Sequence, residues 1–331
     1  MDRRKLFLST ARGGAFLAAG VLAAEARAAR EGSRAAAQTV TIIDIDRCDG
    51  CAGMSVPACV EACRKHNAHR YPEPKKPLRP YWPQKTFEDF SEQRSRIDRL
   101  TPYNWIYVQK IDVDGRTLYA PRRCMHCFDA PCRKLCPFGA IDKTQEGATR
   151  IDDRVCFGGA KCRDVCPWGI PQRQAGVGIY LNAAPTFAGG GVMYKCDGCA
   201  DRPEGRAPAC VESCPRHAMY FGSFDEMLVK LEAIAVDRFV YGRRANGGTA
   251  TWYVSNTPFE VLEKALAKER GPKLRQGEPG FASVSAKLDE SSGLAGVTLA
   301  APLIALGGAF ALYKRRGRSP EGKDTDKKEQ S

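Results

Sequence analysis

The chain has 331 residues and a formal net charge of +13, with 43% hydrophobic and 27% charged residues. These values are typical of a globular protein long enough for two packed units, and they exclude a disordered or fibrous chain. The basic charge is spread along the chain and falls partly on its two ends, so it does not indicate binding to nucleic acid. Cysteine is the unusual residue, with 15 copies.

Residues 1–28 resemble a twin-arginine export signal. Arg3 and Arg4 precede an apolar stretch, and the small residues Ala26 and Ala28 fit cleavage near residue 28. A plain signal or a membrane anchor is the alternative. Twin-arginine export moves folded proteins, so the pattern predicts a chain that folds before it leaves the cytoplasm.

Residues 39–225 contain an internal repeat of cysteines. Each repeat has a close cysteine pair or its remnant, a variable gap and then Cys-x3-Cys, and proline follows the last cysteine of three repeats. Short strand-like and helix-like pieces flank the repeats, which favours an α+β fold of the doubled ferredoxin-like kind with two paired modules. The four quartets are Cys48, Cys51, Cys59 and Cys63; Cys124, Cys127, Cys132 and Cys136; Cys156, Cys162 and Cys166; and Cys196, Cys199, Cys210 and Cys214.

An insertion at residues 64–120 separates the first two quartets. Its second half predicts a hairpin of residues 105–111 and 117–120 around an Asp-Val-Asp-Gly turn. We expect it to cover the cysteine-bearing domain or to meet a partner.

Residues 226–270 form a segment that we expect to pack back onto the domain. Their pattern predicts helices at 223–235 and 258–268 and an extended piece at 251–254. Residues 271–293 are polar and contain glycine, as in a linker.

Residues 294–313 carry no charge over 20 positions, and such a helix would be about 30 Å long, the thickness of a bilayer core. They predict a C-terminal transmembrane helix, with a buried hairpin as the alternative. Basic residues begin the tail at 314–331, so the positive-inside rule predicts a cytoplasmic tail and a body on the periplasmic face of the membrane.

The cysteine spacing predicts iron–sulfur clusters, because cluster iron is bound by thiolates and the Cys-Pro ending matches the bacterial ferredoxin run. Structural zinc is one alternative, but it predicts pairs of cysteine pairs without this repeated ending. Disulfides are another, and they would leave one of 15 thiols unpaired.

Other polar residues lie beside the cysteines in sequence. His126 and His217 are expected to pack against or hydrogen-bond to clusters rather than to bind iron. Basic side chains could offset the negative charge of clusters, or could serve only solubility. They are Lys65, Arg133, Lys134, Lys161, Arg163 and Lys195.

The quartets carry a family resemblance in the motifs at residues 124–127, 166–171 and 195–199. In this order they resemble the four-cluster iron–sulfur subunits of respiratory molybdenum enzymes and membrane-bound uptake hydrogenases. With the signal and the span, the chain looks most like the hydrogenase-2 type iron–sulfur subunit. It is also similar to the beta subunits of molybdopterin oxidoreductases.

The resemblance implies an electron-transfer subunit that is not catalytic on its own. It would relay electrons between a periplasmic catalytic subunit and a multispanning quinone-reactive or cytochrome b subunit of the membrane. A nickel–iron hydrogenase is the catalytic subunit expected first. The alternatives are the same role beside a molybdopterin oxidoreductase of the formate, tetrathionate, polysulfide or dimethyl sulfoxide type, or a structural zinc-binding protein.

The family's pairing joins the first quartet with the fourth and the second with the third. Carried over to this chain, it implies the following ligand sets: Cys48, Cys51, Cys59 and Cys214 for cluster 1; Cys196, Cys199, Cys210 and Cys63 for cluster 2; Cys124, Cys127, Cys132 and Cys166 for cluster 3; and Cys156, Cys162 and Cys136 for cluster 4.

The chain departs from the family pattern at Gly159, where the second cysteine of the third quartet is expected. The nitrate reductase electron-transfer subunit resembles it in having a non-ligand there, which implies a [3Fe-4S] cluster beside three [4Fe-4S] clusters. A four-iron cluster with another ligand and an empty site are the alternatives. An open iron could also bind a substrate, but no convergent acid and base residues occur near Gly159.

Overall fold

The structure is a computed structural model that describes residues 38–80, 88–179, 181, 190–270 and 276–285. The expected signal at 1–28, the span at 294–313 and the tail at 314–331 lie outside these residues. Within the described part, no helix has both the length and the apolar composition that crossing a bilayer requires.

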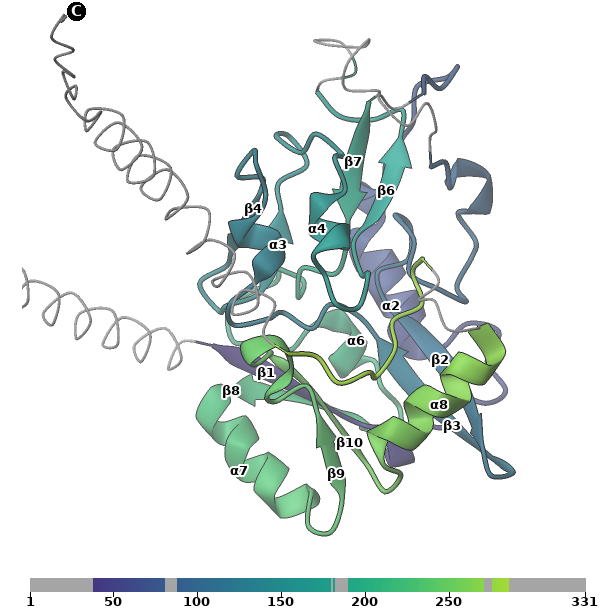
Figure 1. Cartoon of the computed structure of the whole chain (residues 1–331), viewed down its shortest axis with the longest axis vertical. Coiled ribbons are helices and arrows are strands. Elements are labelled where there is room, and N and C mark those ends of the chain that lie inside the picture. The colour runs from purple at the N-terminus through teal and green to yellow at the C-terminus, as the bar shows by residue number, and fades with distance from the viewer. Residues whose placement is uncertain (1–37, 81–87, 180, 182–189, 271–275, 286–331) are drawn as a thin grey trace, which may run out of the picture. The chain divides into compact units, whose positions relative to one another are not determined.

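A four-stranded sheet joins segments from both ends of the described chain (Figure 1). β1 (Thr39–Asp44) pairs antiparallel with β8 (Met219–Ser223) and parallel with β10 (Thr251–Ser255). β9 (Phe239–Tyr241) continues the sheet antiparallel to β10. The expected extended piece at 251–254 is thus a central strand.

Helix α7 (Phe224–Ile234) packs on this sheet. A capping box starts the helix, because the Ser223 side chain accepts from Glu226 N while the Glu226 side chain accepts from Ser223 N. Met227 and Leu231 then pack with buried residues of β1 and β10 in a small core without cysteine. Helix α8 (Phe259–Arg270) follows β10, so the helices predicted at 223–235 and 258–268 are both present.

Three two-stranded hairpins surround the cysteines. The first confirms the hairpin predicted in the insertion, and the others are shorter. They are β2 (Tyr107–Val113) with β3 (Arg116–Arg122), β4 (Ile141–Lys143) with β5 (Thr149–Ile151), and β6 (Gln172–Ala175) with β7 (Gly191–Tyr194).

Four helices carry or precede the Cys-x3-Cys motifs, and they pack in two pairs. Helix α2 packs against α6, and α3 packs against α4, so the first and fourth quartets come together, as do the second and third. The helices are α2 (Ala58–Asn67), α3 (Pro131–Lys134), α4 (Lys161–Asp164) and α6 (Ala209–Glu212). The short 3-10 helices are η1 (Ile45–Arg47), η2 (Ala68–Arg70), η3 (Ser91–Gln93) and η4 (Ala245–Gly247).

Residues 276–285 lie in the segment expected to be a linker, yet they pack on the body. Phe281 is buried, and its ring lies 5.1–5.3 Å from those of Tyr241, Tyr253 and Phe259. Arg122 donates a hydrogen bond to Gly280 O and stacks on the Phe281 ring. We call this segment the strap. The polar composition of residues 271–293 gave no indication that one aromatic residue, Phe281, would anchor the strap to the body.

Candidate metal centres

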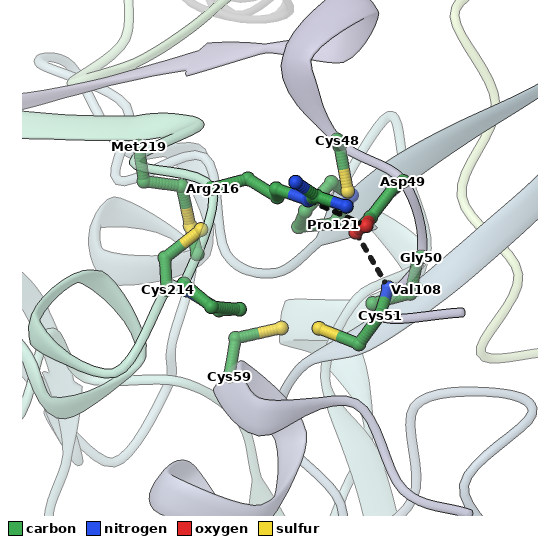
Figure 2. Close-up of a pocket in the computed structure, with 11 residues that line it drawn as sticks. Cys48, Asp49, Gly50, Cys51, Cys59, Val108, Pro121, Cys214, Arg216 and Met219 are labelled. Carbon is green, nitrogen blue, oxygen red and sulfur yellow. Dashed lines mark hydrogen bonds and ion pairs between the residues drawn. The ribbon is translucent and has the colours of Figure 1, made fainter. Parts of the chain in front are cut away.

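The first group of thiols comprises Cys48, Cys51, Cys59 and Cys214. Cys48 and Cys51 lie in the loop after η1, Cys59 lies on α2 and Cys214 follows α6. They line one pocket, and Figure 2 shows their sulfur atoms directed toward a shared space. Apolar side chains from other elements also line it, namely Val108, Pro121 and Met219.

One loop sequence, Cys-Asp-Gly-Cys, builds part of this group and is repeated elsewhere. At residues 48–51 the N–H of Cys51 donates to Asp49 Oδ1 at 2.9 Å, and Gly50 has a φ of 67°. A side-chain acceptor and a glycine with positive φ are the usual means of closing a tight turn. Residues 196–199 repeat the sequence and the hydrogen bond, at 3.1 Å.

The remaining thiols fall into three more groups by their electrostatic influence on one another. Burial raises the pKa of Cys127 to about 12, and the nearby thiolates of Cys124 and Cys132 contribute. In each group, thiolates of the other members likewise raise the pKa of a cysteine beside them. The groups are Cys63, Cys196, Cys199 and Cys210; Cys124, Cys127, Cys132 and Cys166; and Cys136, Cys156 and Cys162.

The four groups follow one another in a row. Burial raises the pKa of Cys59 in the first group, and Cys210 of the second raises it further. Burial also raises the pKa of Cys196 in the second group; Arg123 lowers this pKa, and Cys124 of the third group raises it. Cys132 of the third group also raises the pKa of the buried Cys162 in the fourth. Each group therefore lies within electrostatic reach of the next.

The thiols fit a multi-iron cluster better than a disulfide or a single ion. All 15 cysteines are free. Among the described residues, no three Cys, His, Asp or Glu side chains are arranged to hold one metal ion. In a cluster each thiolate binds a different iron, so the thiols must surround a space rather than meet at a point. Loading such a site releases protons, because the bound form is the thiolate.

Each group also receives a hydrogen bond at sulfur. In the first and fourth groups backbone N–H groups donate at 3.4 Å, from Ala218 to Cys214 and from Met193 to Cys156. In the third group the amide Nδ2 of Asn246 donates to Cys127 Sγ at 3.3 Å. Hydrogen bonds to sulfur are one of the means by which a protein sets cluster potentials.

His126 lies against the second group. Its Nδ1 accepts from Thr149 N at 3.0 Å, so the proton of the neutral ring is on Nε2, which faces Cys196 Sγ at 3.6 Å. Burial holds the pKa of His126 well below its ordinary value. His126 is thus a hydrogen-bonding neighbour, as predicted, whereas His217 is exposed.

The fourth group has three thiols. Gly159, between Cys156 and Cys162, is exposed, and its backbone does not have the positive φ of neighbouring Gly158 and Ala160. The chain therefore supplies no fourth cysteine here, although the fold of the segment would allow a side chain.

The basic residues beside the cysteines differ in burial. Lys195 is buried, whereas Lys65, Lys134 and Lys161 are exposed. Arg133 and Arg163 form ion pairs with carboxylates. Sequence reasoning missed Arg123 and Asn246, which also reach thiols. Arg123 directly precedes Cys124, so its position was an available signal.

Two models of 4Fe-4S dicluster domains match the sequence, over residues 47–140 and 116–224. With the thiol groups, they indicate doubled 4Fe-4S ferredoxin-type domains of mixed α and β content and support several 4Fe-4S clusters. The matched segments join neighbouring quartets along the sequence, whereas the structure groups the first quartet with the fourth.

About a third of the protein is similar in sequence to B-type subunits of anaerobic dimethyl sulfoxide reductases. It is 42% identical over 113 residues to the B subunit of the anaerobic dimethyl sulfoxide reductase of Escherichia coli (strain K12), which is 34% of this protein and 49% of the relative. In the same organism, the probable anaerobic dimethyl sulfoxide reductase subunit YnfG is 40% identical over 118 residues, which is 35% of this protein and 51% of the relative.

A longer match from that strain is the uncharacterized ferredoxin-like protein YdhX, 31% identical over 188 residues, 56% of this protein and 64% of the relative. The matched part thus spans about half the length of the two reductase subunits. The expected likeness to the hydrogenase-2 type subunit is not shown by these relatives.

Proposed function

We propose that the protein is an electron-transfer subunit that relays single electrons through its clusters between a catalytic subunit and a membrane subunit. The observation that carries the proposal is the row of four thiol groups, each beside the next. Such a row gives an electron a path through the protein, from the first thiol group to the fourth.

A molybdopterin oxidoreductase of the dimethyl sulfoxide type is the favoured catalytic partner. Homology to two dimethyl sulfoxide reductase subunits supports this choice over the nickel–iron hydrogenase expected first. The membrane partner would be a multispanning subunit that reacts with quinone or carries cytochrome b.

The four thiol groups are the proposed ligand sets of four clusters, numbered in the order of the row. Clusters 1, 2 and 3 have four thiolates each and would be [4Fe-4S]. Cluster 4 has Cys136, Cys156 and Cys162 and would be [3Fe-4S], because iron at the corner facing Gly159 would have no thiolate. When bound, the clusters supply reversible one-electron chemistry, and the protein holds, spaces and shields them.

The proposed location is the periplasmic face of the cytoplasmic membrane. The twin-arginine pattern at residues 1–28 and the apolar stretch at 294–313 support it. A cytoplasmic tail at 314–331 completes this topology.

The test is to purify the full-length protein from membranes with whatever copurifies and to follow its clusters by EPR. We expect a large molybdopterin subunit in the complex, and dithionite-reduced clusters that are reoxidised on addition of dimethyl sulfoxide. Reduction by hydrogen gas instead would identify a hydrogenase partner and contradict the choice made here. A colourless protein without iron would overturn the function itself.

A further inference from the structure

Two buried cations lie between the second and third thiol groups. Lys195 is 5% exposed and Arg123 is 3% exposed. Each directly precedes the first cysteine of a quartet: Lys195 follows β7 and precedes Cys196, and Arg123 follows β3 and precedes Cys124. The sequence therefore places one cation directly before a cysteine of each of these two groups.

Each cation reaches the group on the other side. Arg123, next to Cys124 of the third group, directs Nη1 at Cys196 Sγ of the second group, 3.9 Å away. Lys195, next to Cys196 of the second group, lies within electrostatic reach of Cys124 and Cys132 of the third. Each cation is thus next to one group in the sequence and acts electrostatically on the other.

Neither cation forms an ion pair with a carboxylate within the described part of the chain. Lys195 Nζ donates to the carbonyl oxygens of Thr149 and Cys196, and Arg123 donates to Thr251 Oγ1 at 3.4 Å besides the thiol. The buried carboxylate of Asp197 is engaged with Arg70, at 2.5 Å.

Charges buried in this way are costly unless an anion lies beside them. The anions that the second and third groups would provide are their clusters, because a cube bound by four thiolates is negatively charged. One-electron reduction adds a further negative charge. A fixed cation stabilises the reduced form more than the oxidised form, and so raises the potential.

We propose that Lys195 and Arg123 form a shared cationic pair that raises the reduction potentials of clusters 2 and 3 together. This inference rests on the proposed function, since it requires clusters at both groups. The pair marks the junction between the two ferredoxin-like halves, where the electron leaves one module for the other. Lys195 also acts on Cys162 of the fourth group, but after the stronger influences of burial, Cys156 and Cys132, so its effect on cluster 4 should be smaller.

The test is an EPR-monitored redox titration of the full-length protein carrying Lys195→Met, which removes the charge and keeps a long apolar side chain. The matched control is Lys161→Met, because Lys161 also directly precedes a cysteine, Cys162, but is exposed. Lys195→Arg retains the charge and should retain the potentials. Iron content is measured for every variant, so that a change in loading is separated from a change in potential.

We expect Lys195→Met to lower the midpoint potentials of clusters 2 and 3, each by a tenfold change in the one-electron equilibrium, about 60 mV, with a smaller shift of cluster 4 and none of cluster 1. Lys161→Met should leave clusters 2 and 3 unchanged. The inference is overturned if the loaded Lys195→Met variant shows no shift, a shift of one cluster only, or an equal shift of all four. If Lys195→Met does not load iron, Arg123→Gln is titrated by the same criterion. Absence of iron from the wild-type protein would refute the proposed function instead.

Discussion

The two ends of the row of thiol groups differ in ligands and in surroundings. The first group has four thiols, and its rim carries a charged pair, Asp49 with Arg216 at 2.6 Å. The fourth group has three thiols, and exposed apolar side chains lie next to it in sequence: Leu135, Phe138 and Val155. The same helix-and-loop repeat thus produces two different ends.

This difference shows that the fold around a thiol group does not depend on the number of its thiols. Both ends use a short helix to present a Cys-x3-Cys motif, so loss of one cysteine has not removed the surrounding fold. An iron site can therefore change its composition through one residue, because the backbone is held by packing between helices and hairpins rather than by the missing thiolate.

Restoring the missing cysteine should make the two ends alike. Gly159→Cys adds a thiol at an exposed position without a positive φ, so we expect the oxidised three-iron EPR signal to disappear and about one iron per molecule to be gained. Gly159→Ser is the control, since it adds a side chain of similar size without a thiol. Retention of the signal in a fully loaded Gly159→Cys variant would show that this position does not face the open corner.

Paired cysteine substitutions should reveal which thiols share a cluster. Cys48→Ala and Cys214→Ala should each remove about four irons, and the double variant should remove no more, because both thiols line the pocket proposed to hold cluster 1. Cys214→Ala with Cys196→Ala should remove about eight irons, although both residues belong to the fourth quartet. Iron analysis that gives the reverse pattern would contradict the grouping of distant quartets.

Loosening the strap should destabilise the fold beside the third group. Phe281→Ala removes a buried aromatic ring, and we expect a loss of about 3 kcal/mol in the free energy of unfolding. The strap contacts Tyr241, which accepts from Trp168 Nε1 at 2.7 Å, two residues beyond Cys166. Chemical denaturation measures the loss, and the exposed Phe239→Ala is the control. An equal loss for both variants would argue against docking of the strap.

The smallest expected effect concerns Asn246. Its φ of 53° suits asparagine or glycine, so Asn246→Gly keeps the backbone and removes the hydrogen bond to Cys127. Loss of one hydrogen bond, about 1 kcal/mol, should lower the potential of cluster 3 alone, about fivefold in its one-electron equilibrium. Redox titration checks this, and an equal shift of cluster 1 would show that the effect is not local to the third group.

Some helices and one hairpin could be predicted from the sequence, because the alternation of polar and apolar residues and the helical periodicity involve residues close together in the chain. The hairpin in the insertion and the helices α7 and α8 follow from such patterns. The parallel pairing of β1 with β10 could not, since Thr41 pairs with Thr251 across most of the domain. Strands β8 and β9 were missed for the same reason.

The cysteines were the strongest signal of the site, but spacing alone did not group them. The grouping of the first quartet with the fourth came from a family resemblance, and the packing of α2 on α6 now gives it a structural basis. Tertiary contacts bring three further side chains to the thiols, those of Arg123, Lys195 and Asn246. The sequence does not distinguish a buried basic residue before a cysteine from an exposed one.

The most direct test of the account is the EPR spectrum of the oxidised, full-length wild-type protein, recorded with iron analysis of the same sample. We expect about 15 irons per molecule and a three-iron signal close to one spin per molecule. About 16 irons without an oxidised signal, or about 12 irons, would contradict the claim that the row ends in a three-thiol cluster.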